Sequence, residues 1–219
     1  DKGADLDNLG NAYADLGETR RAIEYHEQAL AISREIGDRR GEGARLGSLG
    51  LAYAALGETR KAIKYHEQAL AIAREIGDKK NEGYELCNLG RAYSDLNDTD
   101  KAIEYCTKSL DIVRKIEYRK TEGEALTTLG KAYSNIGLLE KAIDHCDQAL
   151  KIFESMEYRK GEGEALFAKS LALHKLDRRT EAAALANEAI QIFVQIESPL
   201  AEKVRQQLAE WQASGPQEN

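Results

Sequence analysis

The chain has 219 residues, with 31 Lys and Arg against 38 Asp and Glu, which gives a formal net charge of −7. This acidic balance provides no positive field for non-specific nucleic-acid binding, so we expect no nucleic-acid partner. No apolar run approaches the roughly 20 residues that a membrane span requires, so we expect no membrane partner. Three cysteines without paired spacing favour a reducing compartment, which by default is the cytoplasm.

The dominant pattern is a repeat of 40 residues without insertions, marked by Gly3, Gly43, Gly83, Gly123 and Gly163. The first two repeats agree at 29 of 40 positions, and the similarity decays towards the C-terminus. The period predicts an array over residues 1–202, with repeats at 3–42, 43–82, 83–122, 123–162 and 163–202.

Each repeat reads as two helices. In the first repeat, apolar residues recur at three- and four-residue steps, which places them on one helical face: Leu6, Leu9, Tyr13 and Leu16. A short break at 17–19 precedes a second amphipathic run over 22–36, so the two helices must pack antiparallel. Gly37 suits a left-handed helix end, and Asp38 suits the cap of the next helix. A single hairpin cannot bury its apolar face, so the repeats must stack.

Small residues indicate how closely the helices pack. Glycine inside a helix costs about 0.5–1 kcal/mol relative to alanine, yet it recurs within the first helix as Gly10, Gly50, Gly90 and Gly130. The recurrence predicts close backbone approach. We expect alanines of the second helix to be the small partners, namely Ala22, Ala62, Ala102, Ala142 and Ala182.

The two ends of the array differ. Ser198 and Pro199 form a good helix start, and they predict a capping helix over 198–213. Residues 214–219 are polar, and we expect a disordered tail there. The chain opens at a full-strength repeat, so we expect a fragment whose parent continues upstream of Asp1. The predicted fold is all-α: an α-solenoid of five antiparallel helical hairpins plus a C-terminal capping helix.

A family resemblance rests on the run Leu9, Gly10 and Tyr13, followed by Ala22 and Ala29. This pattern resembles the tetratricopeptide repeat over residues 3–202. The 40-residue period is similar to the long-helix variety found in Leu-Gly-Asn-repeat G-protein signalling modulators and in bacterial signalling proteins. The resemblance implies a scaffold whose first helices line a concave groove that holds a partner polypeptide.

The resemblance also implies which residues line that groove. Related repeats grip a peptide backbone through asparagine, which both donates and accepts hydrogen bonds. Carried onto this chain, the groove residues are Asn8, Asn11, Asp15, Ser48, Leu51, Tyr84, Asn88, Arg91, Asp95, Thr128, Lys131, Asn135 and His174. The plainer interpretation is that Asn and Ser are tolerated on a solvated helix face. Asp7 and Gly47 stand where clamps for chaperone C-termini need cations, which argues against that subclass.

Paired cations form a second periodic feature near the start of each first helix. Arg40, Lys80, Lys120 and Lys160 stand beside Arg39, Lys79, Arg119 and Arg159. This basic rim steers an acidic peptide, or it pairs with the nearby glutamates Glu42, Glu82, Glu122 and Glu162. We favour the pairing.

Histidines and cysteines share one repeat position: His26, His66, Cys106 and Cys146. Helix axes pack about 8–10 Å apart, whereas zinc ligands must lie about 2.0–2.3 Å from the metal. We therefore expect a semi-buried packing position and no metal site. His145 replaces a tyrosine and is expected to pack like one, whereas Cys87 is expected to be exposed in the groove. There it is either a reactive thiol whose pKa is lowered by Arg91, one turn on, or a plain small residue, and we favour the plain small residue.

No nucleotide-binding loop, catalytic triad or acid–base pair is recognisable, so we expect no enzyme, no catalytic residues and no cofactor. The leading hypothesis is a protein–protein interaction scaffold that binds an extended peptide or helix. One alternative is a C-terminal sensor or autoinhibitory module of a larger signalling NTPase, with an intramolecular partner domain upstream. The other is a self-assembling structural array that stacks on further copies.

Overall fold

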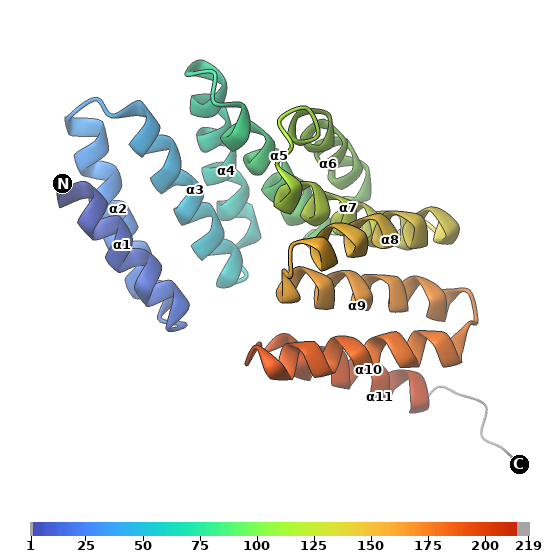
Figure 1. Ribbon diagram of the computed structural model, residues 1–219. Helices are drawn as coiled ribbons and strands as arrows, with labels where there is room; N and C mark the ends of the chain where they lie inside the picture. The colour runs from blue at the N-terminus through green and yellow to red at the C-terminus, as the bar shows by residue number, and fades with distance from the viewer. Residues whose placement is uncertain (1, 214–219) are drawn as a thin grey trace, which may run out of the picture. The chain divides into compact units, whose positions relative to one another are not determined.

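The computed structural model describes residues 2–213, which form eleven α-helices joined by short turns (Figure 1). The predicted tail at 214–219 lies outside the described residues. The helices are α1 (Lys2–Asp15), α2 (Thr19–Glu35), α3 (Arg39–Ala55), α4 (Thr59–Glu75), α5 (Lys79–Asp95), α6 (Thr99–Val113), α7 (Arg119–Asn135), α8 (Leu139–Ser155), α9 (Arg159–Lys175), α10 (Arg179–Gln195) and α11 (Leu200–Ala213). None of these helices is long and apolar enough to cross a membrane.

The helices pair in chain order. Hairpins form between α1 and α2, α3 and α4, α5 and α6, α7 and α8, and α9 and α10. Second helices also pack on the first helix of the following hairpin, as α2 does on α3, α4 on α5, and α8 on α9. The predicted all-α solenoid of helical hairpins is confirmed. The chain divides into two compact units: the N-terminal unit, residues 1–118, and the C-terminal unit, residues 119–219.

The helices begin slightly earlier than the predicted repeats. From the second repeat on, the first helices start at Arg39, Lys79, Arg119 and Arg159, four residues before the glycines that mark the period. Those glycines therefore lie in the first turn or two of a helix, facing a second helix. A Cβ on Gly123 would lie only 2.5 Å from the Phe153 ring, so this position must stay small.

The turns between helices use one left-handed residue each. Gly17, Gly37, Gly57 and Gly77 take positive φ in the first four turns. Later turns hold Asn97, Glu117, Gly137, Glu157, Asp177 and Glu197 in the same region. Asp38 accepts a hydrogen bond from the Gly41 N–H at 2.9 Å, which confirms its predicted capping role.

The mid-helix glycines make room for the histidine and cysteine series. A Cβ on Gly50 would lie 2.5 Å from the His66 ring, and one on Gly130 would lie 2.5 Å from Cys146 Sγ. The predicted alanines also take part: the Cβ positions of Gly90 and Gly130 lie 3.3 Å and 3.2 Å from the carbonyl oxygens of Ala102 and Ala142, which is the close backbone approach expected.

In the fifth repeat, the first helix carries a larger residue at this contact and the second helix carries a smaller one. Ser170 replaces the glycine, and Ala186 replaces the histidine or cysteine, while both residues stay fully buried. The total side-chain volume at this contact is therefore kept roughly constant, as close-packed interiors require.

The capping helix α11 packs on α10 and buries Ala201 and Val204. Ser198 Oγ accepts a hydrogen bond from the Leu200 N–H at 3.3 Å, in keeping with its predicted role at the helix start.

Candidate peptide-binding face

The first helices of the N-terminal unit, α1, α3 and α5, contact one another in series. The polar rows predicted from the sequence lie on these helices. Asn8, Asn11, Asp15, Arg91 and Asp95 are exposed, Ser48, Leu51 and Tyr84 are half-buried, and Asn88 is buried.

Asn88 has an unusual environment for an amide side chain. It is only 3% exposed. Its Oδ1 accepts a hydrogen bond from Arg91 Nη2 at 2.8 Å, and among residues 2–213 its Nδ2 has no hydrogen-bond partner. A buried donor left unpaired costs about 1–3 kcal/mol. What this site lacks is therefore a hydrogen-bond acceptor.

The corresponding row in the C-terminal unit is largely closed. There α7 packs along α9, and Lys175 Nζ donates to the Ser134 carbonyl oxygen at 2.9 Å. Thr128 is buried, and its hydroxyl donates to the Glu124 carbonyl oxygen at 3.0 Å. Lys131 is half-buried and Asn135 is exposed. Within this unit, the predicted groove residues offer little polar surface to a ligand.

The structure places His174 against the capping helix. Its ring stacks on Trp211, with centroids 4.3 Å apart and planes 7° from parallel. Burial lowers the pKa of His174, and the Arg179 cation acts in the same direction. One face of the ring is covered, so we leave His174 out of the proposed binding face.

The expectation that Cys87 is exposed is wrong. Cys87 is buried at 4% exposure, one turn before the mid-helix Gly90 that packs on Cys106. Cys106 and Cys146 are also buried free thiols, and burial raises the pKa of Cys146 to about 12. A thiol with so high a pKa is protonated at neutral pH and unreactive.

Four of the eight cations of the basic rim pair with glutamates. Its inner cations pair with the predicted glutamates: Lys79 with Glu82 at 2.7 Å, Arg119 with Glu122 at 2.7 Å, Arg159 with Glu162 at 2.6 Å, and Arg39 with Glu42. The other four rim cations each follow one of these residues in the sequence. Among them, Lys80 lies over the Tyr118 ring and Lys120 lies over the Tyr158 ring. The pairing interpretation is confirmed for the inner cations.

Two buried histidines pair with carboxylates, and these pairs were not predicted from the sequence. His26 Nδ1 lies 2.8 Å from Asp7 Oδ1, and His66 Nδ1 lies 2.6 Å from Glu85 Oε2. Glu85 belongs to the following hairpin, and it fits because Gly47 leaves space: a Cβ on Gly47 would lie 2.6 Å from Glu85 Oε1. The two carboxylates come from opposite directions along the chain, because Asp7 lies 19 residues before His26 and Glu85 lies 19 residues after His66, so no common spacing indicates them.

The histidine–cysteine series is thus a buried packing position, as predicted, with carboxylate partners added in the first two repeats. His145 packs at the position of the tyrosine that it replaces, with its ring 5.0 Å from that of Tyr133, but the two planes are tilted by 47° whereas the equivalent tyrosine pairs stack within 5° of parallel. Among residues 2–213, no group of three or more His, Cys, Asp or Glu side chains is arranged to hold a metal ion.

Comparisons with known proteins show which solved structures have a similar architecture. The chain resembles the nearly identical repeats of a putative kinesin light chain from Podospora anserina, with a TM-score of 0.66 and 20% identity over 89% of this chain and 95% of that one. It resembles the apo form of RapI, with a TM-score of 0.74 and 19% identity over 90% and 72%.

A third similar structure is a signal transduction ATPase with numerous domains and a tetratricopeptide repeat sensor, from Pyrococcus horikoshii. Its TM-score is 0.71 at 24% identity, over 96% of this chain and 33% of that one. No curated protein matches the chain. The tetratricopeptide repeat sequence model matches residues 4–75 and 81–155, more than half of the chain. The chain therefore belongs to the tetratricopeptide repeat family.

Proposed function

We propose that the chain holds an extended segment of a partner protein on the first-helix face of its N-terminal unit. The tetratricopeptide fold is a protein-interaction fold, which makes a protein partner the natural expectation. The observation that carries the proposal is Asn88, a buried amide whose Nδ2 has no acceptor.

The chemistry of this site selects hydrogen-bond acceptors. Arg91 already donates to the Asn88 oxygen, whereas the amide N–H groups are unpaired among the described residues, and a guanidinium can only donate. Backbone carbonyl oxygens and carboxylates of a peptide are suitable acceptors. The exposed Asn8 and Asn11 extend the polar surface along α1, and the half-buried Leu51 provides an apolar contact on α3.

A peptide array probed with the labelled chain tests this proposal. Peptides that bind the wild-type chain are measured by calorimetry with Asn88→Ala and Arg91→Glu. Removing a hydrogen bond to a buried group is expected to weaken binding by about tenfold. Asn187→Ala is the matched control, because Asn187 is an exposed amide on α10. Equal affinity for all variants would overturn the proposal.

A second candidate is the sensor repeat region of a larger signalling NTPase. The similarity to the multidomain ATPase from Pyrococcus horikoshii supports it, because that protein carries a tetratricopeptide repeat sensor. The reading frame upstream of Asp1 is the test. A nucleotide-binding domain encoded there supports the sensor role, and a frame without one removes it.

Self-stacking is a third candidate, favoured by apolar side chains on α1. Leu9 is 45% exposed, whereas its equivalents Leu49 and Leu89 are completely buried against α2 and α4. Light scattering across a range of concentrations is the measurement. A strict monomer at all concentrations would remove this candidate.

A further inference from the structure

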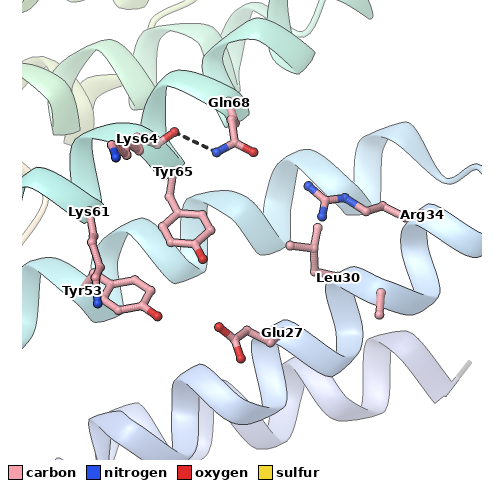
Figure 2. Close-up of a pocket in the computed structure, with 9 residues that line it drawn as sticks. Glu27, Leu30, Arg34, Tyr53, Lys61, Lys64, Tyr65 and Gln68 are labelled. Atoms are coloured by element: carbon pink, nitrogen blue, oxygen red, sulfur yellow. Dashed lines mark hydrogen bonds between the residues drawn. The ribbon is translucent and has the colours of Figure 1, made fainter.

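A pocket of about 520 Å³ lies between the second helices α2 and α4 of the N-terminal unit. Figure 2 shows the side chains around it. Glu27, Leu30 and Arg34 come from α2, Tyr65 and Gln68 come from α4, and Tyr53 comes from the end of α3. None of them belongs to the predicted groove rows, so the pocket is distinct from the first-helix face.

Two tyrosines form one wall of the pocket. The Tyr53 and Tyr65 rings stack with centroids 5.2 Å apart and planes 5° from parallel. Their hydroxyl groups point towards the same open space, across which the Glu27 carboxylate lies (Figure 2). Burial raises the pKa of Tyr65, and Tyr53 and the Glu27 carboxylate contribute in the same direction.

Some of the charged groups around the pocket have a partner of opposite charge, and others do not. Arg34 donates to Glu42 at 2.8 Å, and Lys61 pairs with Glu58 at 2.5 Å, so both cations already have carboxylate partners. Within the described residues, Glu27 has neither a hydrogen bond nor an ion pair. Lys64 also has no carboxylate partner there. Among residues 2–213, the pocket therefore presents one unpaired carboxylate, Glu27, and one unpaired ammonium group, Lys64, beside the tyrosine hydroxyls.

The C-terminal unit shows what this carboxylate lacks. A pocket of about 420 Å³ lies at the same place in the repeat, lined by α8, α9 and α10. Asp147 occupies the repeat position of Glu27, and Lys169 Nζ donates to its Oδ1 at 2.6 Å. In the N-terminal unit the position of Lys169 is held by Leu49, which is buried in the core. Glu27 thus lacks the cation that pairs with Asp147, and the pocket of the N-terminal unit instead has Lys64 where that of the C-terminal unit has Ala184.

We propose that the pocket between α2 and α4 binds a lysine or arginine side chain from a basic segment of a partner polypeptide. The cationic group pairs with Glu27 and meets the tyrosine hydroxyls as acceptors, and its aliphatic stem lies against Leu30. The volume is within the range of about 300–1,000 Å³ that is typical of ligand pockets. The net charge of −7 attracts a basic segment at long range.

The test uses the full chain with ¹³C-labelled tyrosine and two blocked peptides, acetyl-Gly-Gly-Arg-Gly-Gly-amide and its glutamate counterpart. Resonances of Tyr53 and Tyr65 are assigned with Tyr→Phe variants. The arginine peptide is expected to shift both resonances in a saturable manner, and the glutamate peptide is not. The Tyr13 and Tyr25 pair, which stacks in the same way, is the internal control.

Two substitutions at exposed positions determine the sign of the recognised charge. Glu27→Gln is expected to raise the Kd of the arginine peptide about fivefold, because it removes the paired charge. Lys64→Gln is expected to lower the Kd about twofold, because it removes a like charge nearby. Glu24→Gln, on the same helix but outside the pocket lining, controls for net charge.

Three outcomes would overturn the proposal. They are preferential binding of the glutamate peptide with weakening by Lys64→Gln, equal weakening by Glu24→Gln and Glu27→Gln, and the absence of tyrosine shifts with either peptide. None of them affects the proposal for the first-helix face, which rests on Asn88 and is tested with other variants.

Discussion

The N-terminal and C-terminal units place different chemistry at the same repeat positions. Opposite the glycine that marks each repeat, the second helices α2, α4 and α6 carry Ser33, Ala73 and Val113, whereas α8 and α10 carry Phe153 and Phe193. The N-terminal unit instead buries His26 and His66 with carboxylate partners, at a position where the C-terminal unit has Cys146 and Ala186.

The difference extends to the helix ends. Asp38 and Asp78 cap α3 and α5 through side-chain hydrogen bonds, whereas Tyr158 precedes α9 without one and packs edge-on against Phe153. The N-terminal unit thus relies on polar pairs, caps and glycine turns, and the C-terminal unit on aromatic burial. One backbone therefore accepts two sets of side chains that differ in both volume and polar pairing.

The largest effect is expected from Phe153→Ala. Phe153 is 1% exposed and packs against Gly123, Gly161 and Tyr158. Truncating a buried phenylalanine costs about 3–5 kcal/mol. Urea denaturation followed by circular dichroism measures this loss. Val113→Ala in the N-terminal unit is the matched control, and it should cost clearly less because fewer carbon atoms are removed from the core. Equal losses would show that aromatic burial does not distinguish the two units.

The next effect tests the contact between glycine and its partner. Gly50→Leu drives a side chain into the His66 ring and should destabilise the chain by about 1–3 kcal/mol. In the fourth repeat, Gly130→Ser should be tolerated better when combined with Cys146→Ala, because the pair then reproduces Ser170 and Ala186 of the fifth repeat. Thermal melts of the two single variants and of the double variant give the coupling free energy between positions 130 and 146. A melt unchanged by Gly50→Leu would contradict this packing account.

A smaller effect of opposite sign is expected at the turns. Glu157 adopts a φ of +53°, a left-handed backbone conformation that is unfavourable for residues with a side chain. Glu157→Gly should therefore raise stability by about 0.5–1 kcal/mol. Its counterpart in the N-terminal unit is Gly37, at φ of +71°, and Gly37→Ala should lower stability by a similar amount. The midpoint of thermal unfolding reports both changes, and shifts of the same sign would refute the strain argument.

Most of the fold could be predicted from the sequence because the period is uninterrupted and the apolar spacing is helical throughout. The side-chain partners were less accessible. Gly10 and Ala22 both indicated close helix approach, but only the crossing geometry shows that His26 fills the space opposite Gly10. Likewise, the pairing of His66 with Glu85 joins two hairpins, and a helix-by-helix interpretation does not predict such a contact.

The candidate site was predictable only in part. The phase of the first helices identified Asn88 and Arg91 as neighbours on one face, one turn apart. Burial was not predictable in the same way, because it depends on which helix covers each residue. Cys87 and Thr128 were placed in the groove by phase, yet both are buried. The pocket at Glu27 was missed entirely, since its lining comes mainly from second helices, which the resemblance does not assign to binding.

The smallest effect is expected from protonation of His174 at the end of the C-terminal unit. Burial against Trp211 lowers the pKa of His174 below its ordinary value of about 6.5. As the pH falls through 6.5, the unfolded chain takes up this proton before the folded chain does, so unfolding becomes easier. The loss ends once the pH is below the folded-state pKa as well.

Trp211 is the only tryptophan, so its fluorescence reports the docking of α11 during urea titrations at pH 7.5 and pH 5.5. The chain has three other histidines, so the informative quantity is the difference between wild type and His174→Phe. The variant keeps a ring against Trp211 and should lose less stability on acidification. An identical loss in both chains would mean that His174 is equally protonated in the folded and unfolded states.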